Sequence, residues 1–165
     1  MNVKEIFKKS FFLAALIVIF FLTGCATRGY HIPANVPGAG FPEQPFLRPL
    51  SGQLILPFAA KEEGVSIKGI VIRAHENEPV RAARDGEVVL VDPAMQGYGK
   101  IVILRHSDIF STVYARVAEI LVVTGQRVKQ GETIAKAGQA VRGGVPELYF
   151  EIRKNSRPED PTRYF

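Results

Sequence analysis

Histidine and cysteine, which most often hold a transition metal or act as base or nucleophile, are rare in this chain. Its 165 residues contain three histidines, His31, His75 and His106, and one cysteine, Cys25. They form no His-Glu-x-x-His motif, and the chain has neither a Gly-x-Ser-x-Gly turn nor a glycine-rich phosphate loop. We expect His75, in a polar loop, to be solvated and His106, at the end of an apolar run, to be structural. These residues predict neither a metal site nor a hydrolase site.

The cysteine follows an export signal. Three lysines among the first nine residues precede Phe11–Thr23, which is apolar except for its last residue. A helix of this length spans about 20 Å, too short for the ~30 Å hydrocarbon core of a bilayer, so residues 1–24 are expected to be a signal peptide. Leu22-Thr23-Gly24-Cys25 resembles the lipobox of bacterial lipoproteins, which implies a lipid on the thiol of Cys25. An ordinary signal peptide that happens to contain a cysteine is the alternative.

The lipobox resemblance also implies a location. Ala26, rather than aspartate, follows Cys25, which is similar to the outer-membrane sorting signal of enteric-type bacteria. Two or more acyl chains suffice for stable anchoring. We therefore expect a lipid-anchored protein of the cell envelope, on the periplasmic face of the outer membrane.

Composition excludes several classes of protein. A single cysteine leaves no disulfide framework and no zinc site built on cysteine pairs. The formal charge is +5, but no run of Lys or Arg is long enough for a nucleic-acid-binding arm, so no nucleic acid is expected as a partner.

A proline-rich tether is expected over residues 25–46. Prolines every few residues favour extended backbone and exclude a helix or a central strand. At ~3.1 Å per residue, such a segment holds a domain some tens of ångströms from the membrane. Its aromatic residues Tyr30, Phe41 and Phe46 could instead dock on the domain, and the sequence leaves this open.

Residues 47–165 are expected to form one all-β domain, an antiparallel sandwich or barrel. Short β-branched runs alternate with turns every eight to twelve residues, and helical periodicity is absent outside the signal peptide. Two stretches, Pro79–Val88 and Val128–Ala135, echo each other as strand, glycine turn and strand. Lipoyl and biotinyl carriers use similar units, but here Gln96, not lysine, follows Met95. The expected strands are 53–56, 65–68, 70–72, 86–91, 100–104, 110–116, 120–123 and 148–152.

These segments together resemble the LytM, or lysostaphin-like, family of zinc endopeptidases, which cut peptidoglycan cross-links. The match runs in order through nearly all of residues 47–165, including Gly97-Tyr98-Gly99, Tyr114-Ala115 and Leu148–Arg153. It implies a LytM-type antiparallel β-sandwich with a duplicated hybrid motif. Active members hold zinc through His-x-Gly-Ile-Asp and the second histidine of His-x-His, and a further histidine follows Tyr-Ala.

This chain lacks each of those side chains. Ile67 and Val71 stand at the ligand positions of the first motif, and Glu147 and Tyr149 at the His-x-His positions, while Arg116 follows Tyr-Ala. Isoleucine and valine have no lone pair to donate, and a catalytic zinc site needs about three protein ligands. We therefore expect no metal, no cofactor and no catalytic residue, and a protein that is not an enzyme.

A degenerate LytM domain on a lipoprotein resembles the murein hydrolase activators of the EnvC and NlpD type. The resemblance implies that the chain binds an N-acetylmuramyl-L-alanine amidase and displaces its autoinhibitory helix during cell separation. The LysM module and long coiled coil of those activators are not seen in these 165 residues, which leaves septal recruitment open.

Alternation along Leu148–Ile152 predicts the partner surface. It sends Leu148, Phe150 and Ile152 to the core and leaves Glu147, Tyr149 and Glu151 on the other face, and the same parity groups Ile67 with Val71. A groove with an apolar floor, an aromatic wall and charged edges suits an amphipathic helix. For Ile67 and Val71, contact with a partner has an equal alternative, which is that their side chains simply fill the old metal site. The expected groove residues are Ile67, Val71, Arg116, Arg142, Glu147 and Tyr149.

Two other functions compete with the activator. A lipid-anchored module could bind peptidoglycan or an envelope protein without activating anything, and it would sediment with purified sacculi. An active endopeptidase would cleave cross-linked peptides in a chelator-sensitive way, and the residues at the ligand positions argue against it.

Overall fold

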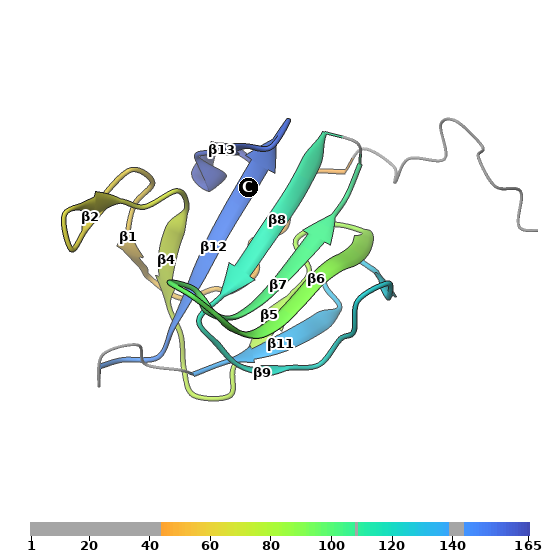
Figure 1. Ribbon diagram of the computed structural model, residues 1–165, viewed down its shortest axis with the longest axis horizontal. Helices are drawn as coiled ribbons and strands as arrows, with labels where there is room; N and C mark the ends of the chain where they lie inside the picture. The colour runs from red at the N-terminus through yellow and green to blue at the C-terminus, as the bar shows by residue number, and fades with distance from the viewer. Residues whose placement is uncertain (1–43, 108, 139–143) are drawn as a thin grey trace, which may run out of the picture. The chain divides into compact units, whose positions relative to one another are not determined.

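The computed structural model describes residues 44–107, 109–138 and 144–165. The expected signal peptide, Cys25, most of the tether and Arg142 lie outside these residues. Within them, all regular structure is β strand except one short 3-10 helix (Figure 1), and no helix is long and apolar enough to cross a membrane. The elements are β1 (Leu54–Leu56), β2 (Lys61–Glu62), β3 (Val65–Ser66), β4 (Ile70–Arg73), β5 (Pro79–Arg81), β6 (Gly86–Met95), β7 (Gly99–Arg105), β8 (Phe110–Ala115), β9 (Val117–Ile120), β10 (Arg127–Val128), β11 (Thr133–Ala137), β12 (Glu147–Lys154), β13 (Arg157–Glu159) and the helix η1 (Pro161–Arg163).

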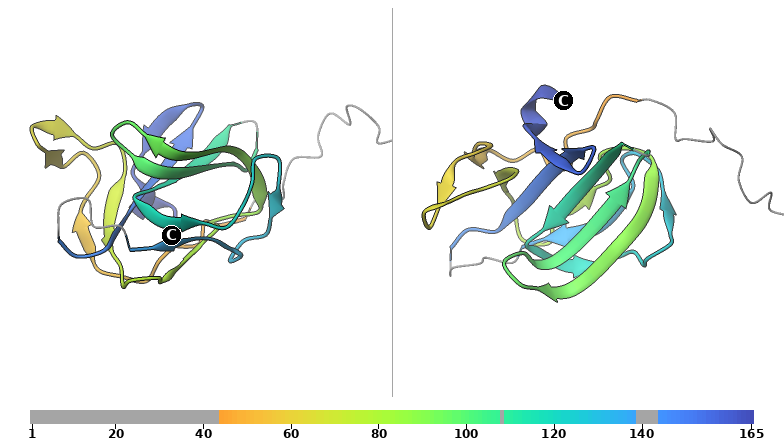
Figure 2. Two further views of the ribbon diagram at one scale, coloured as in Figure 1. Left: turned by 60° about the horizontal axis from the view of Figure 1, so that its bottom comes forward. Right: turned by 45° about the horizontal axis from the view of Figure 1, so that its top comes forward.

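Two antiparallel sheets enclose the main core. The large sheet has the strand order β1-β4-β12-β8-β7-β6-β10, with β13 added to β12, and the small sheet has the order β5-β11-β9. Figures 1 and 2 show the long strands of the large sheet twisting across the small one. The strands form where β-branched residues concentrate, as in the Ile-Val-Ile run of β4. The expected all-β antiparallel sandwich is confirmed.

The main core is apolar and draws on both sheets. On β12, Leu148, Phe150 and Ile152 are fully buried in it, as the period-two alternation predicted. Val80 and Ala135 of the small sheet face them from the other layer. The sandwich is thus stabilised mainly by apolar burial between its layers.

The two echoing stretches pair with each other. β6 pairs with β10, placing Gly86 opposite Val128, and β5 pairs with β11. In the turn before β6, the Asp85 carboxylate accepts a hydrogen bond from the backbone of Gln130 at 2.7 Å. A Cβ atom at Gly86 would lie 2.7 Å from the carbonyl oxygen of Arg105, so this position requires glycine. The internal repeat therefore forms one interlocked unit.

Two expected strands differ from the observed ones by more than two residues at a boundary. The strand expected at 120–123 is wrong, because β9 is Val117–Ile120 and the chain then enters a turn at Thr124-Gly125, where Gly125 has φ 88°. β6 runs beyond residue 91 to Met95 despite Pro93. The register shifts between Asp92 and Met95, and such an irregularity accommodates a residue that cannot donate to the ladder.

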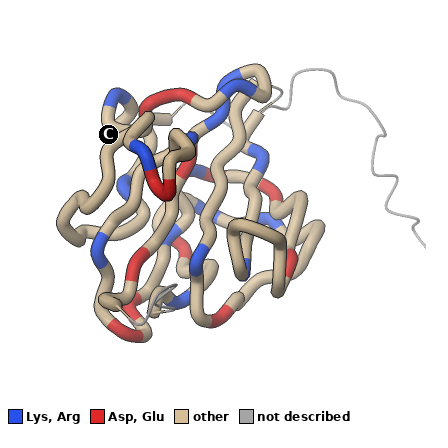
Figure 3. The backbone as a smooth tube through the Cα atoms, turned by 60° about the vertical axis from the view of Figure 1, so that its left-hand side comes forward, with Lys and Arg blue, Asp and Glu red and all other residues tan. Residues whose placement is uncertain are grey.

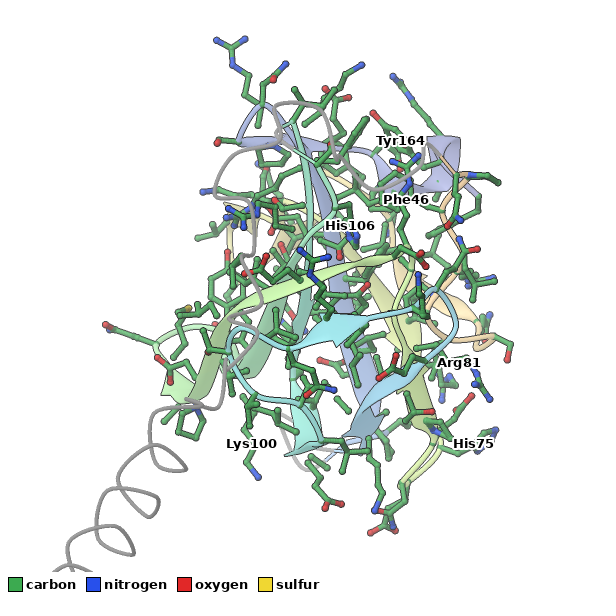
Figure 4. The ribbon with its side chains drawn as sticks, turned by 90° about the vertical axis from the view of Figure 1, so that its right-hand side faces the viewer. Phe46, His75, Arg81, Lys100, His106 and Tyr164 are labelled. Atoms are coloured by element: carbon green, nitrogen blue, oxygen red, sulfur yellow. The ribbon has the colours of Figure 1, made fainter. Side chains whose placement is uncertain are left out.

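Phe46, the last residue of the expected tether, belongs to the core. Its ring is 6% exposed and packs edge-on against the rings of His106, Phe110 and Tyr164, with centroids 5.5–5.6 Å apart. Figure 4 shows Phe46, His106 and Tyr164 gathered at one end of the domain. Of the two alternatives left open for Phe46, docking is the one observed, and the packed domain includes at least this residue.

Candidate functional site

Residues that the sequence resemblance assigns to metal positions lie side by side across the large sheet. β12 runs between β4 and β8, so that Tyr149 stands opposite both Val71 and Ala115. Paired residues of neighbouring strands share a face, and this face is the one opposite the main core. Together with Ile101 and Val113, these three side chains form a second apolar cluster.

A pocket of about 280 Å³ opens over this cluster. The β2–β3 hairpin and the residues after it border one side, and the turn between β6 and β7 borders the other. Apolar, aromatic and charged side chains are mixed in its wall, and Figure 3 shows charges of both signs interspersed over the whole domain. The lining residues are Glu62, Val65, Ser66, Ile67, Lys68, Gly97, Tyr98, Arg116 and Tyr149.

Arg116 is the charged centre of the site. It follows β8 with φ 62°, and its backbone nitrogen donates to the carbonyl of Tyr98 at 3.1 Å. Its Nη1 donates to Glu147 at 2.6 Å, while Nη1 and Nη2 donate to the two carboxylate oxygens of Glu62 at 3.2 and 2.5 Å. The guanidinium carbon lies 5.6 Å from the ring centre of Tyr149. One buried cation thus links β8, β12 and the hairpin.

Burial and the two carboxylates act on the charge of Arg116 in opposite directions. Burial alone would lower the pKa of its guanidinium, but the hydrogen bonds to Glu62 and Glu147 outweigh it, so the pKa is raised. The side chain therefore stays charged at any physiological pH, and it neither donates nor accepts a proton in a reaction.

The side chains at the ligand positions expected from the sequence resemblance do not fit zinc. Ile67 and Val71 offer only carbon atoms, and the Tyr149 hydroxyl donates to a carboxylate. A guanidinium cation, which has no acceptor, occupies the same site. Among the described residues, no group of three His, Cys, Asp or Glu side chains is placed to hold a metal ion.

A second polar row runs along β12. The Tyr149 hydroxyl donates to Glu151 Oε2 at 3.0 Å, and Arg153 Nε donates to Glu151 Oε1 at 2.7 Å. Glu151 is fully buried, so these two bonds compensate for the lost hydration of its charge. Burial, followed by the Glu151 charge, raises the pKa of Tyr149, whose ring also meets Tyr98 edge-on at 5.5 Å. Tyr149 is therefore held in one orientation at the pocket wall.

The structure brings most of the expected groove residues together. Ile67, Arg116 and Tyr149 line the pocket, and Glu147 reaches it through its ion pair with Arg116. Val71 requires a correction, because it is fully buried beneath the pocket and does not line it. Its side chain fills the second apolar cluster instead of forming an accessible floor.

Sequence reasoning missed Glu62, Lys68 and Tyr98 as site residues and Glu151 as a fully buried charge. The alternation that placed Glu147 and Tyr149 on one face of β12 also places Glu151 there, so Glu151 could have been predicted as a neighbour of the site. No sequence signal marks Glu62, because it lies 54 positions before Arg116 and only the fold joins them.

His106 is structural, as expected, and lies away from the pocket. It is 1% exposed, with Nδ1 2.8 Å from the Asp85 carbonyl oxygen and Nε2 2.7 Å from the Thr112 hydroxyl. A carbonyl only accepts, so Nδ1 carries the proton of the neutral ring. His75 is exposed and lies at the opposite end of the domain (Figure 4).

Residues 65–161 match the sequence profile of peptidase family M23. The outer membrane antigenic lipoprotein B of Haemophilus influenzae is 40% identical over 116 residues, which cover 70% of this chain and 28% of that protein. The murein hydrolase activator NlpD of Escherichia coli is 36% identical over 116 residues, covering 70% of this chain and 30% of NlpD. The chain thus spans less than a third of the length of either relative.

The fold also matches a solved structure. The catalytic domain of the antimicrobial peptidase lysostaphin from Staphylococcus simulans superposes with a TM-score of 0.58 at 24% identity, over 68% of this chain and 89% of that domain. The sandwich is therefore of the lysostaphin type that the sequence resembled.

Proposed function

The chain belongs to peptidase family M23, and from this premise we propose that it is a non-catalytic activator of peptidoglycan amidases. The observation that carries the proposal is the state of the former metal site. Ile67 and Val71, which have no donor atoms, stand at two of the expected ligand positions. The Arg116 cation lies beside them and pairs with the carboxylates of Glu62 and Glu147. These side chains do not provide a ligand set for a zinc ion that would activate water, but a shaped pocket opens beside them.

The pocket suits one face of an amphipathic helix. Val65, Ile67 and the rings of Tyr98 and Tyr149 supply apolar contact, while charged residues lie among them. Tyrosine and arginine at the centre of a contact are frequent anchors of protein interfaces. We propose that the autoinhibitory helix of an N-acetylmuramyl-L-alanine amidase binds here, which frees the amidase's own active site.

Names of relatives support the biological setting. A murein hydrolase activator and an outer membrane lipoprotein both match over 70% of this chain. We propose that Cys25 carries the lipid and that the domain acts from the periplasmic face of the outer membrane in cell separation. Peptidoglycan itself is a further candidate partner.

A dye-release assay on labelled peptidoglycan tests the proposal. The full-length protein in mild detergent, the host's periplasmic amidase, and their mixture are compared. We expect release well above that of the amidase alone only in the mixture. Release by the protein alone would overturn the non-catalytic assignment. No stimulation of a competent amidase, together with sedimentation of the protein with sacculi, would favour a peptidoglycan-binding module.

A further inference from the structure

The β2–β3 hairpin beside the pocket is weakly built. Within the described part of the chain, its strands pair only with each other, through Lys61 with Ser66 and Glu62 with Val65, and Figure 1 shows the hairpin projecting from the two sheets. At its base, the backbone of Ile67 donates to the Ala60 carbonyl at 2.9 Å. An isolated two-stranded hairpin is marginally stable in water, so its position depends on contacts with the rest of the domain.

Glu62 supplies a strong contact of this kind. Its two carboxylate oxygens accept hydrogen bonds from the forked guanidinium of Arg116. The side chains of Glu62 and Arg116 are only 20% and 9% exposed. Two-point pairs of carboxylate and guanidinium are stronger and more directional than ordinary surface ion pairs. We name this contact the Glu62–Arg116 latch.

In the closed latch, Glu62 occupies Arg116, the residue that a partner would need for binding. Arg116 has two carboxylate partners of different kinds: Glu147 belongs to the central strand β12, whereas Glu62 belongs to the projecting hairpin. A carboxylate from another molecule can therefore replace Glu62 without disturbing the sheet. Once Glu62 has left, Arg116 and Lys68 remain as pocket cations, so charge complementarity selects an acidic side chain.

We propose that Glu62 is an internal stand-in for the partner, and that the bound amidase segment presents an acidic side chain that displaces it from Arg116. This inference rests on the proposed function. It names the chemistry of the partner's contact and makes binding depend on opening the hairpin. The apparent Kd is then the intrinsic Kd divided by the fraction of molecules in which the latch is open.

Hydrogen exchange of the full-length protein without a partner tests the latch itself. Glu62→Gln is compared with Glu119→Gln, which removes a carboxylate from a pair with Lys136 at 2.7 Å in the small sheet. We expect the hairpin amides, with Ile67 as reporter, to exchange about fivefold faster in Glu62→Gln and unchanged in Glu119→Gln. Unchanged protection in Glu62→Gln would overturn the latch, whatever the amidase does.

Binding to the purified host amidase tests the displacement. We expect Glu62→Gln to lower the Kd about fivefold and Glu119→Gln to leave it unchanged. One acidic residue of the amidase's inhibitory segment, replaced by its amide, should weaken binding to the wild type but not to Arg116→Gln. An unchanged or higher Kd for Glu62→Gln would overturn the displacement, since the hairpin would then belong to the docking surface. If no variant binds, the proposed function and the displacement both fail, while the exchange experiment still decides the latch.

Discussion

The hydroxyl of Tyr149 donates to the carboxylate of Glu151 at 3.0 Å, and that carboxylate is completely buried. The position that the sequence resemblance assigns to a zinc-binding histidine is therefore used to stabilise an internal charge. We expect Tyr149→Phe to lower the free energy of unfolding by about 2 kcal/mol, because a hydrogen bond to a buried charge is lost.

A double-mutant cycle with Glu151→Gln checks this interpretation by chemical denaturation. The summed losses in the free energy of unfolding of the two single variants should exceed the loss in the double variant by at least ~1 kcal/mol. The reason is that both single variants remove the same interaction. Strict additivity would mean that the two side chains do not stabilise each other.

Burial of His106 predicts a loss of stability in mild acid. Burial lowers the pKa of its imidazole from 6.5 to about 4, although the hydrogen bond to the Asp85 carbonyl opposes the change. Between these values the unfolded chain binds a proton that the folded chain excludes, so the free energy of unfolding falls as pH falls from about 6.5 to about 4. The loss is up to about 3 kcal/mol.

Urea titrations across this pH range measure the effect. His106→Gln should remove most of the pH dependence, whereas His75→Gln, at an exposed position, should retain it. The Asp85 carboxylate, whose pKa is lowered by the Gln130 and Lys129 hydrogen bonds, titrates below this range. An equal pH dependence in His106→Gln and the wild type would contradict the account.

Phe46 should be part of the stabilising core. Phe46→Ala removes a ring that is 6% exposed, and we expect it to lower the free energy of unfolding by about 3 kcal/mol. Phe165→Ala is the matched control, because that ring is 45% exposed and should cost under about 1 kcal/mol. Equal effects in thermal or chemical denaturation would mean that the packing of Phe46 is not retained in solution.

Zinc should have no effect on the domain. Since Ile67 and Val71 offer no donor atom, neither micromolar zinc nor a chelator should shift the Tm. An active lysostaphin-type endopeptidase, treated in parallel, is the positive control. A saturable rise of Tm with zinc would show that the protein holds a metal after all.

The fold was largely predictable because its signals are local. Alternation along β12 assigned Leu148 and Phe150 to the core, and the two echoing stretches marked the repeat that joins the sheets. The site was less predictable, because it depends on what covers the second face of the large sheet. Alternation predicts the face of the sheet on which Glu151 lies, but it does not predict that Glu151 is buried. No local sequence pattern predicts the contact between Glu62 and Arg116.

Val71 is a further residue whose face was predictable from the sequence but whose burial was not. Its parity with Ile67 is correct, but parity cannot distinguish a side chain that lines a pocket from one that fills the space beneath it. The difference arises from the packing of Tyr149, Ile101 and Val113 around it.

The most direct measurement compares Arg116→Ala with Arg105→Ala in the amidase dye-release assay. Arg105 is a matched control, because it pairs with Glu87 at 3.1 Å but does not line the pocket. We predict that Arg116→Ala abolishes at least nine-tenths of the stimulation while circular dichroism shows an intact fold, and that Arg105→Ala stimulates as the wild type does. Full stimulation by a folded Arg116→Ala protein would contradict the account, because the former metal site would then have no part in activation.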